Sequence, residues 1–368
     1  MKEKSKKVLV GMSGGVDSAV AALLLQKDGF EVRGLFIDFV GGEKSENDFK
    51  KARQVANKLG IEIYKVGAIK EFQEKIIDKF VADYEMGITP NPCVICNPEM
   101  KFKILIEEAK KRGIDFVATG HYVRLRRKAP ISKSQFPNKS QNSNFKSQSL
   151  NQLFVAKDEN KDQSYFLYRL TQEQLSKTIF PLGDYDKSEV RKIAEENGFD
   201  FKDEKESQDI CFVADNDFGG FLKNKIKNNS GEIVDMNGRK LGEHNGLHFY
   251  TIGQRKGINL GGDGPYYVIR KDKLKNQLVV SNNSDDLFCQ NGTFEIQDVN
   301  WIGDNLEFPL KAKVKTRYGN QGEYAIITKK DEDIFAVKLE KNQKAITSGQ
   351  SAVFYSEGGE VLGGGIII

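Results

Sequence analysis

The sequence is poor in the residues that cross-link small secreted proteins and in those that bind metals. Its 368 residues include only 4 cysteines and 3 histidines. So few cysteines in so long a chain exclude a disulfide scaffold and favour a reducing compartment, the cytoplasm. No apolar run approaches the roughly 20 residues that a membrane-spanning helix needs. The N-terminal MKEKSKKVLVGM passes from charges straight into a short apolar run, unlike a secretory signal. We therefore expect no membrane association.

The chain also has little net charge, +4 at pH 7, but the charge is unevenly distributed. Residues 116–157 contain no acid and several basic residues, namely Arg124, Arg126, Arg127, Lys128, Lys133, Lys139, Lys146 and Lys157. Such a stretch can neutralise phosphates. Its middle, Lys128–Asn151, is rich in Ser, Asn, Gln and Lys and predicts a disordered or loosely ordered loop. The LFVAKD that follows predicts a returning strand, so we expect the insert to cap a hairpin.

The chain length favours two or three domains. In the first half, short apolar runs (KKVLVGM, EVRGLFIDF, IEIYKV, IDFVATG) alternate with helical patterns, of which IKEFQEKIIDKFVADYEMG is the longest. This alternation predicts an α/β domain with a parallel sheet covered on both faces. Further helices are expected at KFKILIEEAKKRG, TQEQLSKTIF and KSEVRKIAEENGF. After Gly231, short strands between Gly, Asn and Asp turns predict all-β structure, one or two small barrels.

The stretch VLVGMSGGVDSAVAALLL joins the first expected strand to the first expected helix and contains SGGxDS. Gly14 and Gly15 allow a tight turn that brings N–H groups close to an anion, and the helix N-terminus adds its positive dipole end. Ser13 and Ser18 can donate hydroxyl hydrogen bonds, and Asp17 could hold magnesium or cap the helix. The pattern is neither the Walker loop nor GxGxxG. It predicts a phosphate-binding loop, with a plain glycine-rich turn capped by Asp as the alternative.

Two of the four cysteines form a CxxC in TPNPCVICNPEMKF. A structural zinc site needs four ligands, but Cys211 and Cys289 are single and distant, and no histidine has ligand spacing beside a cysteine. The flanking TPNP and CNPEMKF do not fit a CxxC at a helix start in a small redox fold. Cys289, in SDDLFCQNG, is interpreted as an ordinary strand cysteine. Cys211 lies in ESQDICFVADNDFGGFL, a short apolar patch after polar residues.

The glycine-rich loop resembles the PP-loop of the N-type ATP pyrophosphatases, which activate a substrate oxygen with AMP and release pyrophosphate. GMSGGVDS, TPNPCVICNPEMKF, GHYVR, KDQSYFLYRL, ESQDICF and YTIGQRKGI together resemble, in order and spacing, the tRNA-specific 2-thiouridylase family. The resemblance covers essentially the whole chain except the Lys128–Asn151 insert. It implies an ATP-dependent transferase that adenylates the 2-oxygen of the anticodon wobble uridine and then replaces it with sulfur. It also implies a PP-loop α/β domain over 1–205, a small central β-rich domain over 206–275 and a C-terminal β-barrel over 276–368.

The same resemblance assigns the sulfur chemistry to three cysteines. It implies that Cys211 carries a persulfide loaded by an upstream sulfur relay protein. Cys96 is then the nucleophile that attacks it, freeing sulfide or leaving a Cys96–Cys211 disulfide. Many members have Asp where this chain has Cys93, so the sequence departs here from one branch of the family. Either Cys93 supports the relay, or Cys93, Cys96 and Cys211 hold an iron–sulfur cluster with one open iron.

Substrate-binding residues are also implied by the resemblance. For ATP, with Mg²⁺ bound through the nucleotide and no other metal, they are Gly11, Met12, Ser13, Gly14, Gly15, Val16, Asp17, Ser18, Ile37 and Gly120. For tRNA, whose wobble base must be splayed out to expose its 2-oxygen, they are Asn91, Pro92, Cys93, His121, Lys161, Asp162, Gln163, Arg317, Tyr318 and Gln350. The family acts on the tRNAs for Lys, Glu and Gln. We expect a monomer.

Two rival functions are weighed against this one. The first is another PP-loop tRNA sulfurtransferase, such as a 4-thiouridine or 2-thiocytidine synthetase. Those enzymes typically carry a separate N-terminal RNA-binding domain, or a central CxxC with a different loop, whereas this sequence begins at the loop and ends in β structure. The second is an RNA-binding module with an inactive nucleotide fold. An intact SGGxDS and three suitably placed cysteines argue against it, and an exchange assay between ATP and pyrophosphate separates the two.

Overall fold

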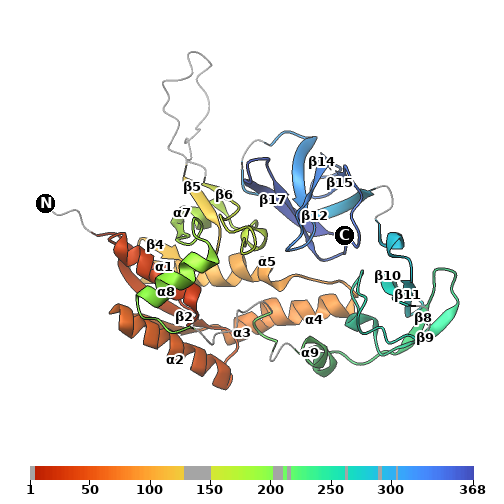
Figure 1. Cartoon of the computed structure of the whole chain (residues 1–368), viewed down its shortest axis with the longest axis horizontal. Coiled ribbons are helices and arrows are strands. Elements are labelled where there is room, and N and C mark those ends of the chain that lie inside the picture. Colours follow the sequence, from red (N-terminus) through yellow and green to blue (C-terminus); the bar gives the residue numbers. More distant parts are fainter. Residues whose placement is uncertain are drawn as a thin grey trace, which may run out of the picture.

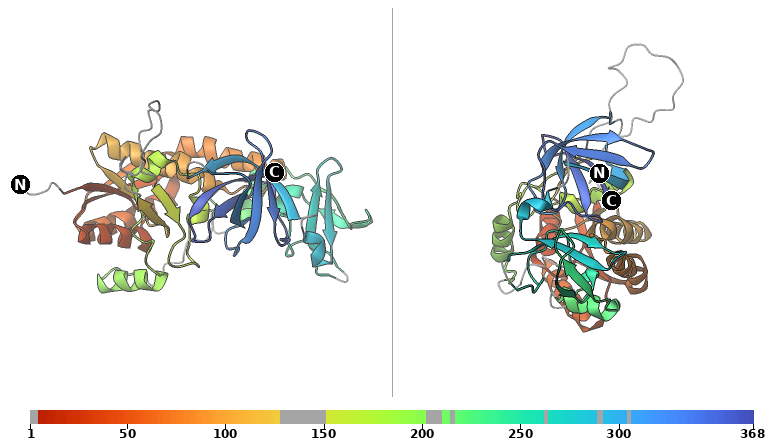
Figure 2. Two further views of the ribbon diagram at one scale, coloured as in Figure 1. Left: turned by 90° about the horizontal axis from the view of Figure 1, so that it is seen from above. Right: turned by 90° about the vertical axis from the view of Figure 1, so that its right-hand side faces the viewer.

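A computed structural model describes residues 5–127, 151–201, 210–213, 217–261, 264–288, 292–303 and 306–368. Within these residues the chain forms an α/β part, a four-stranded sheet and a closed β-barrel (Figure 1). Seen from above, the barrel lies between the other two parts (Figure 2). Cys289 and residues 128–150 of the expected insert lie outside the described residues.

The α/β part is built on a parallel five-stranded sheet of order β3-β2-β1-β4-β7. Its strands are β1 (Lys7–Gly11), β2 (Glu31–Asp38), β3 (Ile63–Gly67), β4 (Phe116–Ala118) and β7 (Thr178–Ile179). Successive side chains of β1 point to opposite faces. Val8 and Val10 therefore pack with α1 (Val16–Lys27), α2 (Gly42–Leu59) and α8 (Lys187–Glu196), while Leu9 packs on the opposite face. The predicted parallel sheet with both faces covered is confirmed.

A long helical segment leaves the opposite face of this sheet and runs toward the four-stranded sheet (Figure 1). It consists of α3 (Ile69–Phe72), η1 (Gln73–Ile77) and α4 (Asp78–Glu85), which matches the expected long amphipathic helix. Phe72 and Ile76 are buried against the sheet. Phe80 and Tyr84, further along, pack against aromatic side chains of α9 (Phe218–Lys225). One amphipathic helix thus contributes to two cores.

The helix that carries the CxxC begins earlier than we expected. We expected it from Lys101, but α5 (Pro92–Cys96) and η2 (Asn97–Phe102) precede α6 (Lys103–Lys111). Proline is favoured at the first helical position, and the Asn91 side chain accepts a hydrogen bond from the Cys93 amide at 3.2 Å. The CxxC therefore does stand at a helix start, and the contrary expectation was wrong.

The expected helix over TQEQLSKTIF was too long. It ends at Lys177 in α7 (Gln172–Lys177), and Thr178 and Ile179 form β7. These two β-branched residues pair in parallel with Val117 and Ala118 of β4, because edge pairing on an open sheet satisfies their backbone groups.

The expected hairpin is present. β5 (Arg124–Arg127) and β6 (Asn151–Phe154) pair antiparallel, with Arg127 opposite Asn151. Asn151, which we had placed in the insert, is therefore the first residue of β6. Its side chain is buried, and Gln172 accepts a hydrogen bond from its backbone amide at 2.9 Å.

The second half is all-β, as predicted. The four-stranded sheet, of order β10-β11-β8-β9, consists of β8 (Gly231–Val234), β9 (Lys240–His244), β10 (Tyr267–Asp272) and β11 (Gln277–Ser281). The barrel closes in the order β12-β15-β14-β13-β16-β17, with strands β12 (Thr293–Trp301), β13 (Leu310–Lys315), β14 (Glu323–Lys329), β15 (Phe335–Leu339), β16 (Ser351–Tyr355) and β17 (Val361–Ile367). Closure leaves no free barrel edge. Of the helices in the described ranges, none combines the length and apolar content needed to cross a bilayer.

Candidate active site

The glycine-rich loop occupies residues 12–15, between the end of β1 and the start of α1. The Ser18 hydroxyl accepts from the Ser13 amide at 3.3 Å and donates to the Gly15 carbonyl at 2.9 Å. Gly14 has φ +92°, and a Cβ there would stand 2.9 Å from the Asp48 carbonyl oxygen of α2. Only glycine fits this left-handed position so close to a neighbouring helix. The backbone N–H groups at the start of α1 are thereby held in a tight turn suited to an anion.

Asp17 has a partner that the sequence did not reveal. Its carboxylate accepts from Lys187 Nζ at 2.6 Å and 2.8 Å, and from the Tyr122 hydroxyl at 2.8 Å. No side chain caps α1, so the interpretation of Asp17 as a helix cap was wrong. The carboxylate instead joins the first helix to α8, far along the chain. Lys187 follows a run of turn residues, PLGDYD, and this stretch contains no pattern that predicts a contact with Asp17.

Other residues expected at ATP reach the same edge of the sheet. Gly120 follows β4, and a Cβ there would lie 2.7 Å from the carbonyl carbon of Asp17 and 2.9 Å from the Ser18 amide. Ile37 lies near the end of β2, next to buried Asp38. Because β2 and β4 flank β1 on opposite sides, this edge is where the strand order reverses, the place at which open α/β sheets bind ligands.

Replacing Gly120 with Ala is expected to weaken ATP binding about tenfold and to cost about 1–3 kcal/mol of stability. The new methyl group would push on backbone atoms of Asp17 and Ser18, which cannot move without shifting the start of α1. Calorimetric titration with ATP and urea unfolding measure the two effects. Gly67→Ala is the matched control, because nothing lies within 4 Å of a Cβ there. Unchanged ATP affinity in Gly120→Ala would contradict the assigned position.

The three described cysteines come from two distant segments but gather at one place. Cys93 and Cys96 lie on α5, and Cys211 lies in the segment 210–213. Cys96 and Phe212 pack against the same core cluster. A thiolate at Cys211 would repel charge on both Cys93 and Cys96, which contributes to their raised pKa values. None of the three forms a disulfide. We find them as reduced thiols within electrostatic reach of one another.

The surroundings of these thiols favour the protonated form. Burial raises the pKa of Cys93 to about 11 and that of Cys96 to about 12. Desolvation by the surrounding protein also raises the pKa of Cys211, although this side chain reaches the surface. Lys101 opposes the rise in the pKa of each thiol, and Lys44, whose ammonium donates to the Cys211 carbonyl at 3.4 Å, opposes it at Cys211. Sequence reasoning missed both lysines, although Lys101 lies inside the quoted CxxC motif.

The thiols do not form a ready-made metal site. In the part of the chain that the structure describes, no group of three or more His, Cys, Asp or Glu side chains is arranged to hold a metal ion. The side chains as placed therefore do not fit an iron–sulfur cluster.

Phe212 holds the Cys211 segment in place. Its ring packs on Phe72, Phe80 and Phe221, with centroids 5.8, 5.3 and 5.5 Å away. These rings belong to the long helix and to α9. Cys211 is therefore exposed on a segment whose next residue is anchored in an aromatic core.

Phe212→Ala is expected to destabilise the protein by about 2–3 kcal/mol, since it removes a ring that contacts three others. Urea unfolding measures this change. Alkylation of Cys211 should become faster at the same time, because the segment loses its anchor. Phe288→Ala is the control, because Phe288 is 39% exposed and should change stability by less than about 1 kcal/mol. An equal effect of the two substitutions would argue against the anchoring role.

The residues expected near the target base lie beside the thiols. Asn91 caps α5, and Pro92 is buried at its first position. His121 stacks on Phe102 of η2 at 5.8 Å, and its Nδ1 lies 2.7 Å from the Thr119 hydroxyl. Burial, with Lys101 nearby, holds the pKa of His121 well below its usual range, so the imidazole is neutral at pH 7. Contact of these side chains with RNA stays a prediction.

The residues expected on the 161–163 loop have partners inside the protein. Asp162 is buried and accepts from the amides of Ala156 and Ser164 at 3.1 and 3.2 Å. Gln163 accepts from the Tyr122 amide at 3.0 Å. The loop is thus fixed against the strand region that follows Gly120. Lys161 lies at its partly exposed start.

The three barrel residues expected at tRNA link the barrel to the other parts. Arg317 donates to the carbonyls of Ile252 and Ala345 at 3.0 and 2.7 Å, which ties the barrel to the segment before β10. Gln350 donates to the Thr89 carbonyl at 2.7 Å, just before α5. Tyr318, 47% exposed, lies 4.5 Å from the Phe166 ring. Of the three, Tyr318 alone has an aromatic ring, and contact of this ring with a base stays a prediction.

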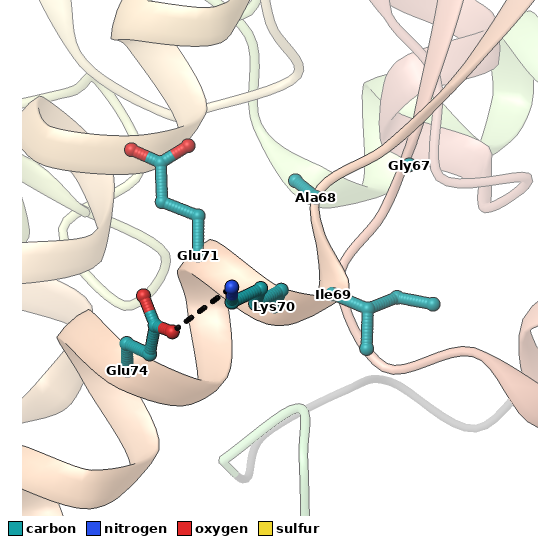
Figure 3. Close-up of a pocket in the computed structure, with 6 residues that line it drawn as sticks. All are labelled: Gly67, Ala68, Ile69, Lys70, Glu71 and Glu74. Atoms are coloured by element: carbon teal, nitrogen blue, oxygen red, sulfur yellow. Dashed lines mark ion pairs between the residues drawn. The ribbon is translucent and has the colours of Figure 1, made fainter.

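One hollow lies away from this site. It has about 390 Å³ and is lined by Gly67, Ala68, Ile69, Lys70, Glu71 and Glu74. Figure 3 shows the Lys70 ammonium directed at Glu74, 3.9 Å away. None of the residues expected to bind ATP or tRNA, or to carry sulfur, lines it. A smaller hollow is lined partly by Asn91, Pro92 and Ile95, beside the thiols.

Three family models match the chain. They are described as tRNA methyl transferase HUP domain (residues 6–215), tRNA methyl transferase PRC-barrel domain (219–282) and aminomethyltransferase beta-barrel domain (291–367). A Clostridium tetani protein named tRNA-specific 2-thiouridylase MnmA 2 is 43% identical over 377 residues, which cover 98% of each chain. A Clostridioides difficile protein named tRNA-specific 2-thiouridylase MnmA is 40% identical over 99% of this chain and 98% of that one.

Similarity to solved structures is weaker. The U34-tRNA thiolase NcsA from Methanococcus maripaludis, solved with its 4Fe–4S cluster, is 21% identical, with a TM-score of 0.35. The match covers 57% of this chain and 62% of that one.

Proposed function

Because the chain belongs to the tRNA-specific 2-thiouridylase family, we propose that it catalyses ATP-dependent 2-thiolation of the wobble uridine of tRNA. The observation that carries the proposal is the gathering of Cys93, Cys96 and Cys211 in the same α/β part as the glycine-rich loop. ATP pyrophosphatase activity needs only the glycine-rich loop. Sulfur transfer needs both the loop and the thiols.

In the first half-reaction, the uridine 2-oxygen attacks the α-phosphorus of ATP, and the bond to the β-phosphate oxygen breaks. Pyrophosphate leaves with that electron pair, while the base becomes an O-adenylate. The loop N–H groups and the start of α1 hold the phosphate chain. Ser13 and Ser18, whose hydroxyl oxygens lie 3.4 Å apart, are positioned to donate to it. The activated carbon can then lose AMP instead of hydroxide.

In the second half-reaction, the terminal sulfur of a Cys211 persulfide is delivered to the activated carbon. The Cys96 sulfur attacks the Cys211 sulfur and its thiol proton passes to the terminal sulfur of the ionised persulfide, while the bond between the two persulfide sulfurs breaks and its electron pair goes to the terminal sulfur, which is released as hydrosulfide. The terminal sulfur bonds to the carbon, and AMP leaves with the oxygen. A Cys96–Cys211 disulfide remains, which an external dithiol reduces before the next turnover. Cys93 supports this step from the start of α5.

Several further properties are proposed with this function. Mg²⁺ is expected to bind through the ATP phosphates, since both oxygens of Asp17 already accept from Lys187. The substrates are the tRNAs for Lys, Glu and Gln, and the persulfide comes from a sulfur relay protein. We place the enzyme in the cytoplasm as a monomer, with domains at 1–205, 206–275 and 276–368, except that β11 (Gln277–Ser281) belongs with the four-stranded sheet of the central domain.

The test is tRNA thiolation by protein purified without oxygen, with ATP and a small-molecule persulfide as donor, beside measurements of iron and acid-labile sulfide. Thiolation by iron-free protein supports the persulfide relay. Thiolation only by protein carrying near-stoichiometric iron, lost in Cys93→Ser as well, would replace the relay with a cluster. A protein that binds tRNA but releases no pyrophosphate would be an RNA-binding module instead.

A further inference from the structure

The contact between Asp17 and Lys187 lies at the centre of the expected nucleotide site, and the thiolation scheme gives it no role. Asp17 is the second residue of α1, directly after the glycine-rich loop. Its two carboxylate oxygens accept from the same ammonium at 2.6 Å and 2.8 Å. The Lys187 side chain is only 13% exposed, whereas most lysine side chains project into solvent.

Several contacts fix the lysine in this place. Lys187 is the first residue of α8, and its backbone N–H donates to Asp158 at 3.0 Å. Val190 and Ala194 of α8 are buried in the same core as the apolar residues of α1. The ammonium also lies 5.7 Å from the centre of the Tyr122 ring, on its face. The packing of two helices, rather than a flexible surface contact, therefore delivers this charge to the loop.

The contact with Lys187 changes the net charge beside the glycine-rich loop. A bare carboxylate at the start of α1 would repel the phosphate chain of ATP, which carries several negative charges at pH 7. Lys187 cancels that charge. An ammonium has three N–H donors, and the two contacts with Asp17 use two of them.

We propose that Lys187 is a further ATP-binding residue, which donates its third N–H to the phosphate chain, and that Asp17 is the residue that positions it. This inference rests on the proposed function only for the identity of the nucleotide. Asp17 then serves neither as a magnesium ligand nor as a helix cap. Its task is to hold a buried lysine in the direction of the loop.

The test is ATP binding, measured by calorimetric titration without tRNA, with pyrophosphate release in the presence of tRNA as a second readout. Lys187→Met keeps the length of the side chain and removes its charge. It is expected to weaken ATP binding about tenfold to a hundredfold, the effect of losing one hydrogen bond to a charged group. Lys192→Met is the matched control, since Lys192 lies on the same helix, is 76% exposed and faces Glu196 at 3.8 Å.

A double-mutant cycle separates the proposal from its alternatives. If Asp17 acts through Lys187, Asp17→Asn should weaken ATP binding, and the double variant should bind no worse than Lys187→Met alone. Additive losses would overturn the positioning role. Full recovery of affinity in the double variant would show that Lys187 only neutralises Asp17 and does not contact ATP. Wild-type affinity in Lys187→Met would overturn the proposal outright.

The proposed function can fail independently. If the wild type thiolates tRNA and Lys187→Met binds ATP normally, the inference fails and the function stands. If the wild type binds ATP through Lys187 but never thiolates tRNA, the inference stands and the proposed function fails.

Discussion

Cys211→Ser is expected to lower tRNA thiolation by a thousandfold or more, on the order of the loss seen when an enzyme loses its nucleophile. A serine hydroxyl cannot carry the transferable sulfur, so no sulfur reaches the activated base. The variant should still release one pyrophosphate per active site, because the glycine-rich loop is distant in the sequence and is unaltered. Quantifying 2-thiouridine by mass spectrometry and pyrophosphate by a coupled assay checks both halves.

Cys96→Ser should behave in the same way, whereas Cys93→Ser serves as the comparison. Cys93 shares α5 with Cys96, and burial raises the pKa of its thiol as well. In the persulfide relay it only supports the transfer, so its loss should cost less than about a hundredfold. Equal losses from all three substitutions, together with iron in the active preparation, would instead support a cluster. Loss of pyrophosphate release in Cys211→Ser would show that this cysteine also shapes the nucleotide site.

Alkylation of Cys96 by iodoacetamide is expected to be slow at neutral pH and to accelerate about tenfold per pH unit from pH 7 to pH 10. The thiolate is the reacting form, and burial raises the pKa of Cys96 to about 12, so at pH 8 only about one thiol in ten thousand is ionised. An unfolded chain in urea should level off above about pH 9, because an ordinary thiol has a pKa of about 8.5. Restricted access of iodoacetamide to Cys96 would lower the alkylation rate equally at every pH. The slope of the rate against pH therefore reports the ionisation of the Cys96 thiol.

Lys101→Met sharpens this experiment. Lys101 lowers the pKa of Cys96, so removing its charge should raise that pKa further and slow alkylation at each pH. Lys103→Met is the matched control, because Lys103 lies on the neighbouring helix and faces Glu71 at 3.7 Å. A plateau near pH 9 in the folded protein would show that the Cys96 thiol is not desolvated as the structure indicates.

The sequence alone predicts the order of strands and helices well, because apolar periodicity and glycine stops are local signals. The parallel sheet, the long helix over 69–85 and the β-rich second half all follow from such patterns. Element boundaries follow less well. The start of α5 at Pro92 depends on a side-chain cap from Asn91, and β7 depends on a neighbouring strand, β4, from elsewhere in the chain.

Some residues of the candidate site can likewise be predicted from local sequence patterns, whereas others cannot. A loop motif is local, so residues 13–18 could be proposed from the sequence. Lys187 and Lys44 are lysines in ordinary turn or helix contexts, and only folding brings them to Asp17 and to Cys211. Partners such as the Thr119 hydroxyl beside His121, or the amides that Asp162 binds, are equally invisible before the chain is folded.

The barrel contacts the segment before α5, so residues from the end of the chain lie next to the helix that carries two of the thiols. Gly349, with φ +89°, packs so closely on Ile88 and Thr89 that a Cβ would lie 2.2 Å from the Ile88 side chain, and the Thr89 amide donates to the Ser348 carbonyl at 3.1 Å. The turn before β16 therefore packs on the segment that leads into α5, the helix with two of the thiols. The glycine-rich loop and Lys187 lie in the α/β part, whereas the segment that leads into the thiol helix also contacts the barrel. We therefore expect removal of the barrel to disturb the thiols before it disturbs the nucleotide loop.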